Sequence, residues 1–252
     1  MPSLSIVVPV FNEAGTLEQV IEKAVGIGLD LEIIIVDDCS TDATPAIIER
    51  LCARHPNVRS LRLPTNSGKT AALRTGFAET TGEIVIVQDA DLEYDPEEIP
   101  AVIAPILEGK AAVVYGSRFL VRRAARVVYF YHYLGNKFLT LFSNALTNLN
   151  MTDVETCYKA FRGDIIRNMK IGSSGFGFEI EVTAKIAKLK CPVYEVPISY
   201  YGRTYEEGKK ITAIDGLAAL WYIVRYNLFC SRRASFIELP VSRSPRAKQS
   251  QA

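Results

Sequence analysis

Short apolar runs alternate with amphipathic stretches through the first 116 residues of the chain. Runs rich in β-branched residues span 4–10, 31–38, 58–63, 83–89 and 111–117. Several of them are apolar without alternation, which is typical of strands covered on both faces of a mostly parallel sheet. The stretches between them have a helical period and begin near capping or first-turn residues, namely Thr16, Thr41 or Asp42, Gly68, and Asp95 before Pro96. The pattern predicts a doubly wound α/β fold, in which ligands bind beyond the carboxyl ends of the strands.

The pattern changes after residue 117. Residues 118–126 hold four arginines and no acidic residue, and an aromatic-rich helical pattern follows over 127–150. Further along, the chain predicts a helix over 175–189, an extended segment over 192–202, a charged loop over 203–210 and a helix over 211–229. We expect one domain over 1–230, made of the parts 1–116 and 117–230. The basic, weakly hydrophobic residues 231–252 predict a disordered tail.

Composition narrows the classes of protein. A chain of 252 residues with 48% apolar content can fill the core of one large domain. The formal net charge of +1 gives no global field that would attract nucleic acid. Five scattered cysteines without a C-x-x-C pair favour reduced thiols in a cytosolic setting over disulfides or a zinc site. We expect no signal peptide, and the apolar run 217–224 is far shorter than the ~20 residues of a membrane-spanning helix.

The segment IVIVQDADLEYD, residues 84–95, carries the strongest chemical signal. Side chains alternate along a strand, so Asp89 and Asp91 can point the same way from its frayed end. Two carboxylates this close repel each other unless a cation neutralises them. Oxygen ligands suit Mg²⁺ or Mn²⁺, and Mg²⁺ usually pairs one or two carboxylates with the phosphates of a substrate. The alternative is a solvated acidic turn after a core strand.

Other polar residues follow neighbouring strands. Carboxylates such as Glu13 and Asp38 can accept hydrogen bonds from a base or a ribose, and Phe11 offers a stacking face. Each of these polar residues, taken alone, could also be an ordinary helix cap, and this alternative applies especially to Asp42 and Thr44. Residues 66–76 share only the fragment GKT with a phosphate loop, but a lysine at a helix N-terminus, Lys69, can meet a phosphate or a neighbouring carboxylate.

Together these segments resemble the family 2 glycosyltransferases with the GT-A fold, from about residue 3 to about residue 215. The motifs that carry the resemblance are PVFNE, VDDCSTDAT, N-x-GK-x-x-A-x-R-x-G, DAD and GSR, in that order. Within the family the chain looks most like the dolichol-phosphate mannose synthase group and its bacterial polyprenyl-phosphate relatives. The resemblance implies a C-terminal helical elaboration on the acceptor side of the fold.

The resemblance also implies a set of donor contacts. Glu93 falls where this group often adds a third metal ligand to Asp89 and Asp91, although it also fits a surface residue. The basic residues of a loop that meets the donor diphosphate would be Arg203 and Lys209. The remaining donor contacts would be Pro9, Phe11, Glu13 and Asp38 around the base and ribose, and Asp89, Ala90 and Asp91 at the metal and diphosphate.

The family expectation is direct displacement at the anomeric carbon with inversion. A hydroxyl acceptor needs a strong general base, whereas a lipid phosphate, with a second pKa of about 6, is already an anion at neutral pH. Arginine suits phosphate oxygens, so Arg118, Arg122 and Arg126 are the candidate acceptor contacts. Arg118 matches the arginine of the GSR motif. The position that aligns with the second family arginine carries Tyr129, and Arg126 is the substitute.

Two later segments fit either a site or plain structure. Asp153 and Glu155 would touch sugar hydroxyls if their loop closes over the sugar, or would belong to a locally capped turn. Glu179 begins a helix and can face the site.

The sequence therefore predicts a metal-dependent hexosyltransferase that moves a sugar from a UDP- or GDP-linked donor to a polyprenyl phosphate, dolichyl or undecaprenyl. We expect a cytoplasmic protein, peripheral on the cytosolic face of the membrane, with no nucleic-acid partner and an open oligomeric state. The first alternative is transfer to a soluble or polysaccharide hydroxyl, although the Q-x-x-R-W motif of processive members is absent. A non-catalytic nucleotide-sugar-binding domain is the second.

Overall fold

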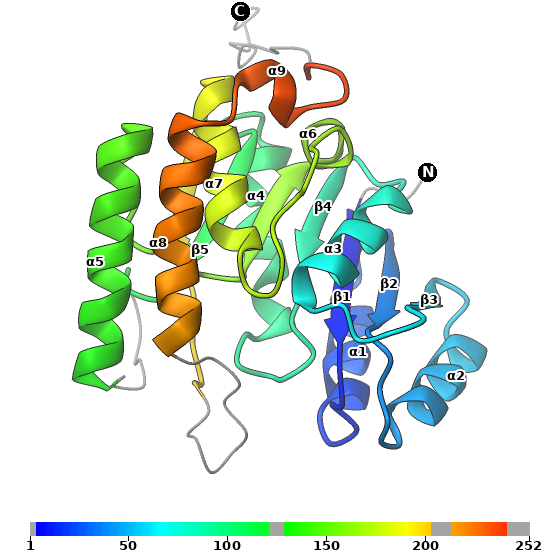
Figure 1. The fold of residues 1–252 in the computed structure, drawn as a ribbon. Coiled ribbons are helices and arrows are strands. Elements are labelled where there is room, and N and C mark those ends of the chain that lie inside the picture. The colour runs from blue at the N-terminus through cyan, green and yellow to red at the C-terminus, as the bar shows by residue number, and fades with distance from the viewer. Residues whose placement is uncertain (1–3, 121–128, 203–212, 241–252) are drawn as a thin grey trace, which may run out of the picture.

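The computed structural model describes residues 4–120, 129–202 and 213–240, and these residues form one seven-stranded sheet (Figure 1). The strand order is β3-β2-β1-β4-β6-β5-β7. The strands are β1 (Leu4–Val10), β2 (Leu31–Asp37), β3 (Val58–Arg62), β4 (Ile84–Val87), β5 (Val113–Ser117), β6 (Lys159–Arg162) and β7 (Val193–Pro197). Only β6 runs antiparallel to its neighbours β4 and β5. The mostly parallel α/β sheet predicted from the apolar runs is confirmed.

Helices follow most of the strands and cover the sheet. In chain order they are α1 (Leu17–Gly26), α2 (Thr44–Arg54), α3 (Lys69–Ala78), the 3-10 turn η1 (Pro96–Glu98), α4 (Ile99–Leu107), α5 (Phe130–Thr147), α6 (Gly163–Arg167), α7 (Phe178–Leu189), α8 (Ala213–Leu228) and α9 (Arg232–Ser235). The predicted starts near Thr16, Gly68 and Asp95 agree with the structure, since these residues are the N-caps of α1, α3 and η1.

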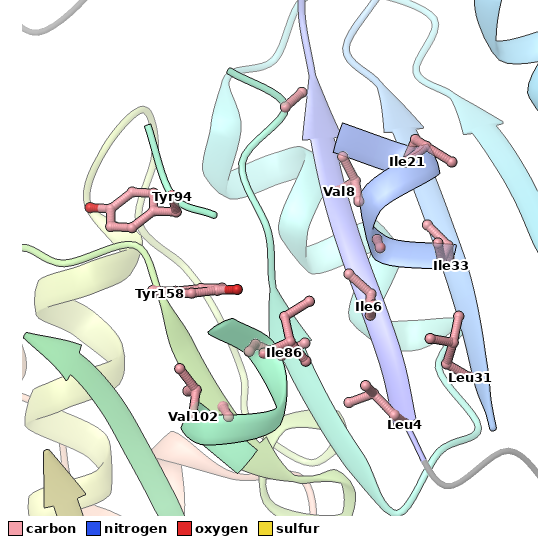
Figure 2. Packing of buried hydrophobic residues seen from close by; sticks show 14 of the residues in the cluster. Leu4, Ile6, Val8, Ile21, Leu31, Ile33, Ile86, Tyr94, Val102 and Tyr158 are labelled. Atoms are coloured by element: carbon pink, nitrogen blue, oxygen red, sulfur yellow. The ribbon is translucent and has the colours of Figure 1, made fainter. Parts of the chain in front are cut away.

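The period of two along β1 divides the core between the two faces of the sheet. Ile6 and Val8 belong to the cluster that includes apolar residues of α1, α2 and α4 (Figure 2). Val7, between them in sequence, belongs to the cluster on the other face with residues of α3, α6 and α7. Because both faces are covered, β1 has no solvent-facing side, which explains why it is apolar except for the buried Ser5.

The C-terminal helices form a layer beside α7. Ile180 of α7 and Ile223 of α8 are buried in one cluster, and Phe142 of α5 packs against it. Figure 1 shows α5 and α8 side by side at one flank of the molecule. In the part of the chain that the structure describes, no helix combines the length and the hydropathy needed to cross a membrane.

Before residue 231, β6 and the short α6 that follows it were not predicted. β6 has the sequence KAFR, which is too short and too polar to give an alternating signal. Its first residue, Lys159, is fully buried and donates hydrogen bonds to the main-chain carbonyls of Val154 and Thr156. A buried lysine satisfied by carbonyl oxygens is a tertiary feature that periodicity cannot indicate.

The prediction of disorder from Ser231 onward is wrong for residues 231–240. The Ser231 side chain accepts a hydrogen bond from the Ala234 N–H and caps α9, and Phe236 is buried at 2% exposure. The main chain of Phe236 also forms an isolated antiparallel β-bridge with Met169. One large apolar side chain in the core therefore holds a segment whose average composition is polar. Residues 241–252 lie outside the described part.

Candidate active site

A cavity of about 340 Å³ opens at the carboxyl ends of β1, β2 and β4. Its walls combine residues from these strand ends, from the start of α3, and from two later loops. The lining residues are Pro9, Val10, Phe11, Glu13, Asp38, Asn66, Gly68, Lys69, Ala72, Asp89, Ala90, Asp91, Glu93, Cys157, Gly175, Phe176 and Tyr200. The cavity lies where a doubly wound sheet binds its ligands.

The structure brings most of the predicted donor contacts together around this cavity. The predicted residues that line it are Pro9, Phe11, Glu13, Asp38, Lys69, Asp89, Ala90, Asp91 and Glu93. Arg203 and Lys209 lie outside the described residues, as do the acceptor candidates Arg122 and Arg126. The described residue Arg118 is not part of the cavity wall.

Three loops at this edge hold non-glycine residues in the left-handed backbone region. Asn12 follows β1 with φ of 54°, Cys39 follows β2 with φ of 63°, and Leu92 follows β4 with φ of 61°. This conformation is costly, most of all for a bulky residue such as leucine. Backbone strain of this kind clusters at ligand sites, and here it marks the edge that carries the cavity.

Asp38 fixes the loop that leads into α3. Its two carboxylate oxygens accept hydrogen bonds from the N–H groups of Ser67 at 2.7 Å and Gly68 at 2.8 Å. Gly68 has φ of +85°, and a Cβ on it would stand 3.4 Å from the backbone of Gly175. A glycine is required at this turn, and the turn aims the next residue, Lys69, into the cavity.

The three carboxylates after β4 have different partners. Asp89 Oδ1 lies 2.7 Å from Lys69 Nζ. Asp91 Oδ1 accepts the main-chain N–H of Glu93 at 3.1 Å, and Glu93 Oε2 accepts the Tyr200 hydroxyl at 3.0 Å. Among the described residues, no three His, Cys, Asp or Glu side chains are grouped closely enough to hold a metal ion by themselves. Two carboxylates beside a cavity fit a cation that takes its remaining ligands from a bound diphosphate.

Lys69 is the centre of a buried polar cluster. Besides Asp89, its ammonium group contacts Cys157 Sγ at 2.9 Å and Glu179 Oε1 at 3.6 Å. Burial lowers the pKa of Lys69, but the charges of Asp89 and Glu179 outweigh burial and hold it well above its usual value. Burial also raises the pKa of Cys157 well above that of a free thiol. The raised pKa makes the nucleophilic thiolate form of Cys157 less available.

Arg118, next to Tyr200 of the cavity wall, pairs with Asp153. Its Nε and Nη2 donate to the two carboxylate oxygens at 2.7 Å each, and Asp153 is fully buried. Burial alone would raise the pKa of Asp153, but the Arg118 guanidinium lowers it below the usual value. Both carboxylate oxygens of Asp153 therefore accept hydrogen bonds from Arg118.

Glu155 is not part of the cavity wall, and burial together with the charge of Glu179 raises its pKa to about 7.

Sequence reasoning missed Tyr200, which connects the two halves of the site. Its ring lines the cavity, its hydroxyl holds Glu93, and the Arg118 guanidinium lies 5.1 Å from the ring centroid. The next residue, Tyr201, donates its N–H to the Glu93 carbonyl at 3.0 Å. The extended pattern of 192–202 gave no sign that this segment returns to the end of β4. Phe176 and Cys157 were missed for the same reason, since long-range loop contacts place them.

The chain matches known proteins in sequence. The family model described as Glycosyl transferase family 2 matches residues 5–169. A dolichol-phosphate mannosyltransferase from Pyrococcus furiosus is 30% identical over 211 residues, which is 82% of this chain and 58% of that protein. An undecaprenyl-phosphate mannosyltransferase from Micrococcus luteus is 27% identical over 85% of this chain and 90% of its own length. The chain thus spans little more than half of the first relative and most of the second.

Solved structures show the same fold. Glucosyl-3-phosphoglycerate synthase from Mycobacterium tuberculosis, in complex with Mn²⁺, UDP and glucosyl-3-phosphoglycerate, has a TM-score of 0.69 at 20% identity, over 90% of this chain and 80% of that one. The mannosyltransferase PcManGT from Pyrobaculum calidifontis, in complex with GDP-Man and Mn²⁺, has a TM-score of 0.57 at 20% identity, over 82% and 58%. These likenesses confirm the GT-A class of the fold.

Proposed function

The chain belongs to glycosyl transferase family 2, and from this premise we propose that it moves a hexose from a nucleoside-diphosphate sugar to a polyprenyl phosphate. The observation that carries the proposal is the cavity at the strand ends, where Phe11 and Asp38 lie on one side and Asp89 and Asp91 on another. A base and ribose fit the first pair, and a metal-bound diphosphate fits the second. The named relatives support the lipid-phosphate acceptor.

Asp89 and Asp91 would hold Mg²⁺ or Mn²⁺, with Glu93 as a further ligand. Bound there, the cation supplies charge stabilisation for the leaving nucleoside diphosphate. Lys69 adds a positive charge at the start of α3, next to Asp89. Strained loops after β1, β2 and β4 hold the donor contacts in place before the donor arrives. Complexes with Mn²⁺ and UDP or GDP-Man in proteins of the same fold support this assignment.

The acceptor phosphate would meet arginines beyond Tyr200. Arg118 is the described candidate, while Arg122 and Arg126 belong to a segment outside the described residues. Asp153 keeps the Arg118 guanidinium in one orientation, 5.1 Å from the ring centroid of Tyr200, which lines the donor cavity. An acceptor that is already an anion needs this kind of positioning more than it needs a base.

We expect donor binding to be visible as metal-dependent thermal stabilisation. A sugar nucleotide at 100 times its Kd adds about 2.7 kcal/mol, which raises the Tm of a chain of this size by about 5 to 10 °C. The measurement compares UDP-glucose, UDP-N-acetylglucosamine and GDP-mannose with Mn²⁺ and again with EDTA. A rise for one base only, lost in EDTA, supports the donor site. The absence of a shift with all three donors would contradict it.

The membrane surface is the proposed location of the acceptor. Large apolar residues face outward on α5 and α8 at helical spacing: Phe130, Tyr131, Leu134, Phe138 and Leu141 on α5, and Leu217, Trp221 and Leu228 on α8. Figure 1 shows the N-terminal ends of both helices on the same side of the molecule as the carboxyl end of β1. Arg225, in the last turn of α8, and Arg232 and Arg233, on α9, lie toward the other end of α8 and would add attraction to anionic lipid there. An oligomer interface is the competing use of this surface.

We therefore expect the protein to float with anionic liposomes at low salt and to be released at high salt. Phe138→Ser with Trp221→Ser should lower the floating fraction several-fold, because both side chains are more than half exposed on this surface. Leu107→Ser on α4 is the matched control, an equally exposed residue on another surface. Wild-type protein that stays at the bottom of the gradient at low salt would refute membrane binding without touching the transfer chemistry.

A further inference from the structure

Glu179 is a buried carboxylate without a hydrogen bond. It is the second residue of α7 and is 3% exposed, and neither of its side-chain oxygens has a hydrogen-bond donor among the described residues. A helix N-terminus favours a negative charge, but an unsatisfied buried carboxylate is costly and calls for a reason. Lys159, another buried cation of this cluster, donates to the carbonyls of Val154 and Thr156.

The nearest cation to Glu179 in the described part is Lys69, and it is engaged elsewhere. Its ammonium lies 2.7 Å from Asp89 Oδ1 but 3.6 Å from Glu179 Oε1. The second distance exceeds that of a charge-assisted hydrogen bond by roughly 0.8 Å. The Lys69 ammonium thus lies between two carboxylates. It is hydrogen-bonded to Asp89, which lines the cavity, and a small movement would bring it into hydrogen-bond distance of Glu179, which does not line the cavity.

We infer that Glu179 is the alternative partner of Lys69, and that the lysine transfers from Asp89 to Glu179 when a divalent cation binds Asp89. The inference rests on the proposed function for the cation itself. When no divalent cation is bound, the Lys69 ammonium neutralises the charge of Asp89. Once a cation takes Asp89, the ammonium would be buried beside a second positive charge, and Glu179 offers two oxygens that no other described group uses. Glu179 is therefore a positioning residue that acts through Lys69.

The exchange makes a prediction about metal affinity that needs no turnover measurement. Glu179→Gln keeps the shape of the side chain but removes the charge that receives Lys69, so cation binding must leave the ammonium uncompensated. We expect the Kd for Mn²⁺, measured from the free-Mn²⁺ electron paramagnetic resonance signal with UDP or with GDP present, to rise about tenfold, within the range of couplings in shared networks. Glu179→Asp, which keeps the charge, should restore part of the affinity.

Two controls separate an exchange from a general loss of negative charge. Glu155→Gln removes a neighbouring carboxylate that, in the described part of the chain, forms no ion pair or hydrogen bond with Lys69, and it should change the Kd by less than about threefold. In the Lys69→Met background the exchange partner is gone, so adding Glu179→Gln should have no further effect beyond about twofold. Thermal unfolding of each variant checks that the fold persists.

The outcomes are distinct. The exchange would be refuted if Glu179→Gln raised the Kd for Mn²⁺ equally with Lys69 and with Met at position 69. It would also be refuted if Glu155→Gln raised the Kd as much as Glu179→Gln does. Either result would mean that Glu179 acts only as a distant charge. No change from Glu179→Gln would overturn it as well. In each of these cases Mn²⁺ binding by the wild type would leave the proposed function standing. Wild-type protein that binds no Mn²⁺ with either nucleotide would refute the metal dependence of the proposed function and this inference together.

Discussion

Asp91→Asn is expected to lower turnover about a hundred- to a thousandfold while leaving the fold intact. Asp91 lines the cavity, and its Oδ1 accepts the Glu93 N–H at 3.1 Å, a bond that an asparagine oxygen can keep. The substitution therefore preserves the turn after β4 and removes one negative charge from the cation. Losing one preorganised electrostatic contact to developing charge typically costs about 3 to 4 kcal/mol of activation free energy.

The measurement is kcat at saturating donor and Mg²⁺ or Mn²⁺, with the unfolding temperature as the check on the fold. Glu97→Gln is the matched control, because it removes a carboxylate from the same acidic segment at a side chain that is 67% exposed and paired only loosely with Lys23. Its turnover should match that of the wild type. Near-normal turnover of Asp91→Asn with either cation would refute the assignment of the metal to this pair of residues.

The second large expected effect concerns the acceptor. A polyprenyl phosphate, the proposed acceptor, is an anion at neutral pH, so an enzyme that uses it needs to neutralise and orient it rather than deprotonate it. Arg118, which donates to Asp153 Oδ1 at 2.7 Å, is the described candidate for this proposed role. Arg118→Lys keeps a positive charge beside the buried Asp153 but loses the planar fork, and we expect the KM for the lipid phosphate to rise about tenfold while the KM for the donor stays unchanged. A matching rise for the donor would move Arg118 to the donor side of the site.

Local patterns predicted the first half of the fold well. β1 was predicted with its observed bounds, and β2 and β3 were predicted to within one residue. β1 and β2 are buried on both faces and are mostly apolar. In β3 only Val58 is buried, and its alternating sequence is typical of a partly exposed strand. Strand ends in a parallel sheet converge on one edge, so the carboxylates after β1, β2 and β4 could be expected to meet. The structure places them around one cavity.

The second half depends on contacts that no local pattern reveals. β6 enters the sheet as an antiparallel strand of four residues, and Lys159 is buried by it. Tyr200 reaches the cavity through a turn held by Glu93. Phe236 anchors a polar segment through one buried ring. Each of these positions is decided by partners far away in sequence, which periodicity and composition do not encode.

The pairing of Arg118 with Asp153 shows the same limit at the level of one residue. The family resemblance implied a phosphate ligand at Arg118, and the sequence left Asp153 as either a sugar contact or part of a capped turn. In the structure the two side chains form one bidentate ion pair, and burial makes each dependent on the other. The residue types were informative, but their partners could be learned only from the fold.

The most direct test of the central claim is the fate of the sugar. A radiolabelled sugar nucleotide, chosen by the thermal-shift comparison, is incubated with Mn²⁺ and polyprenyl phosphate, and in parallel with phosphoglycerate, before extraction into organic solvent. We predict label in the organic phase as an acid-labile product that requires both the polyprenyl phosphate and the cation. Label that stays in the aqueous phase with polyprenyl phosphate but is transferred to phosphoglycerate would contradict the lipid acceptor and favour a soluble one.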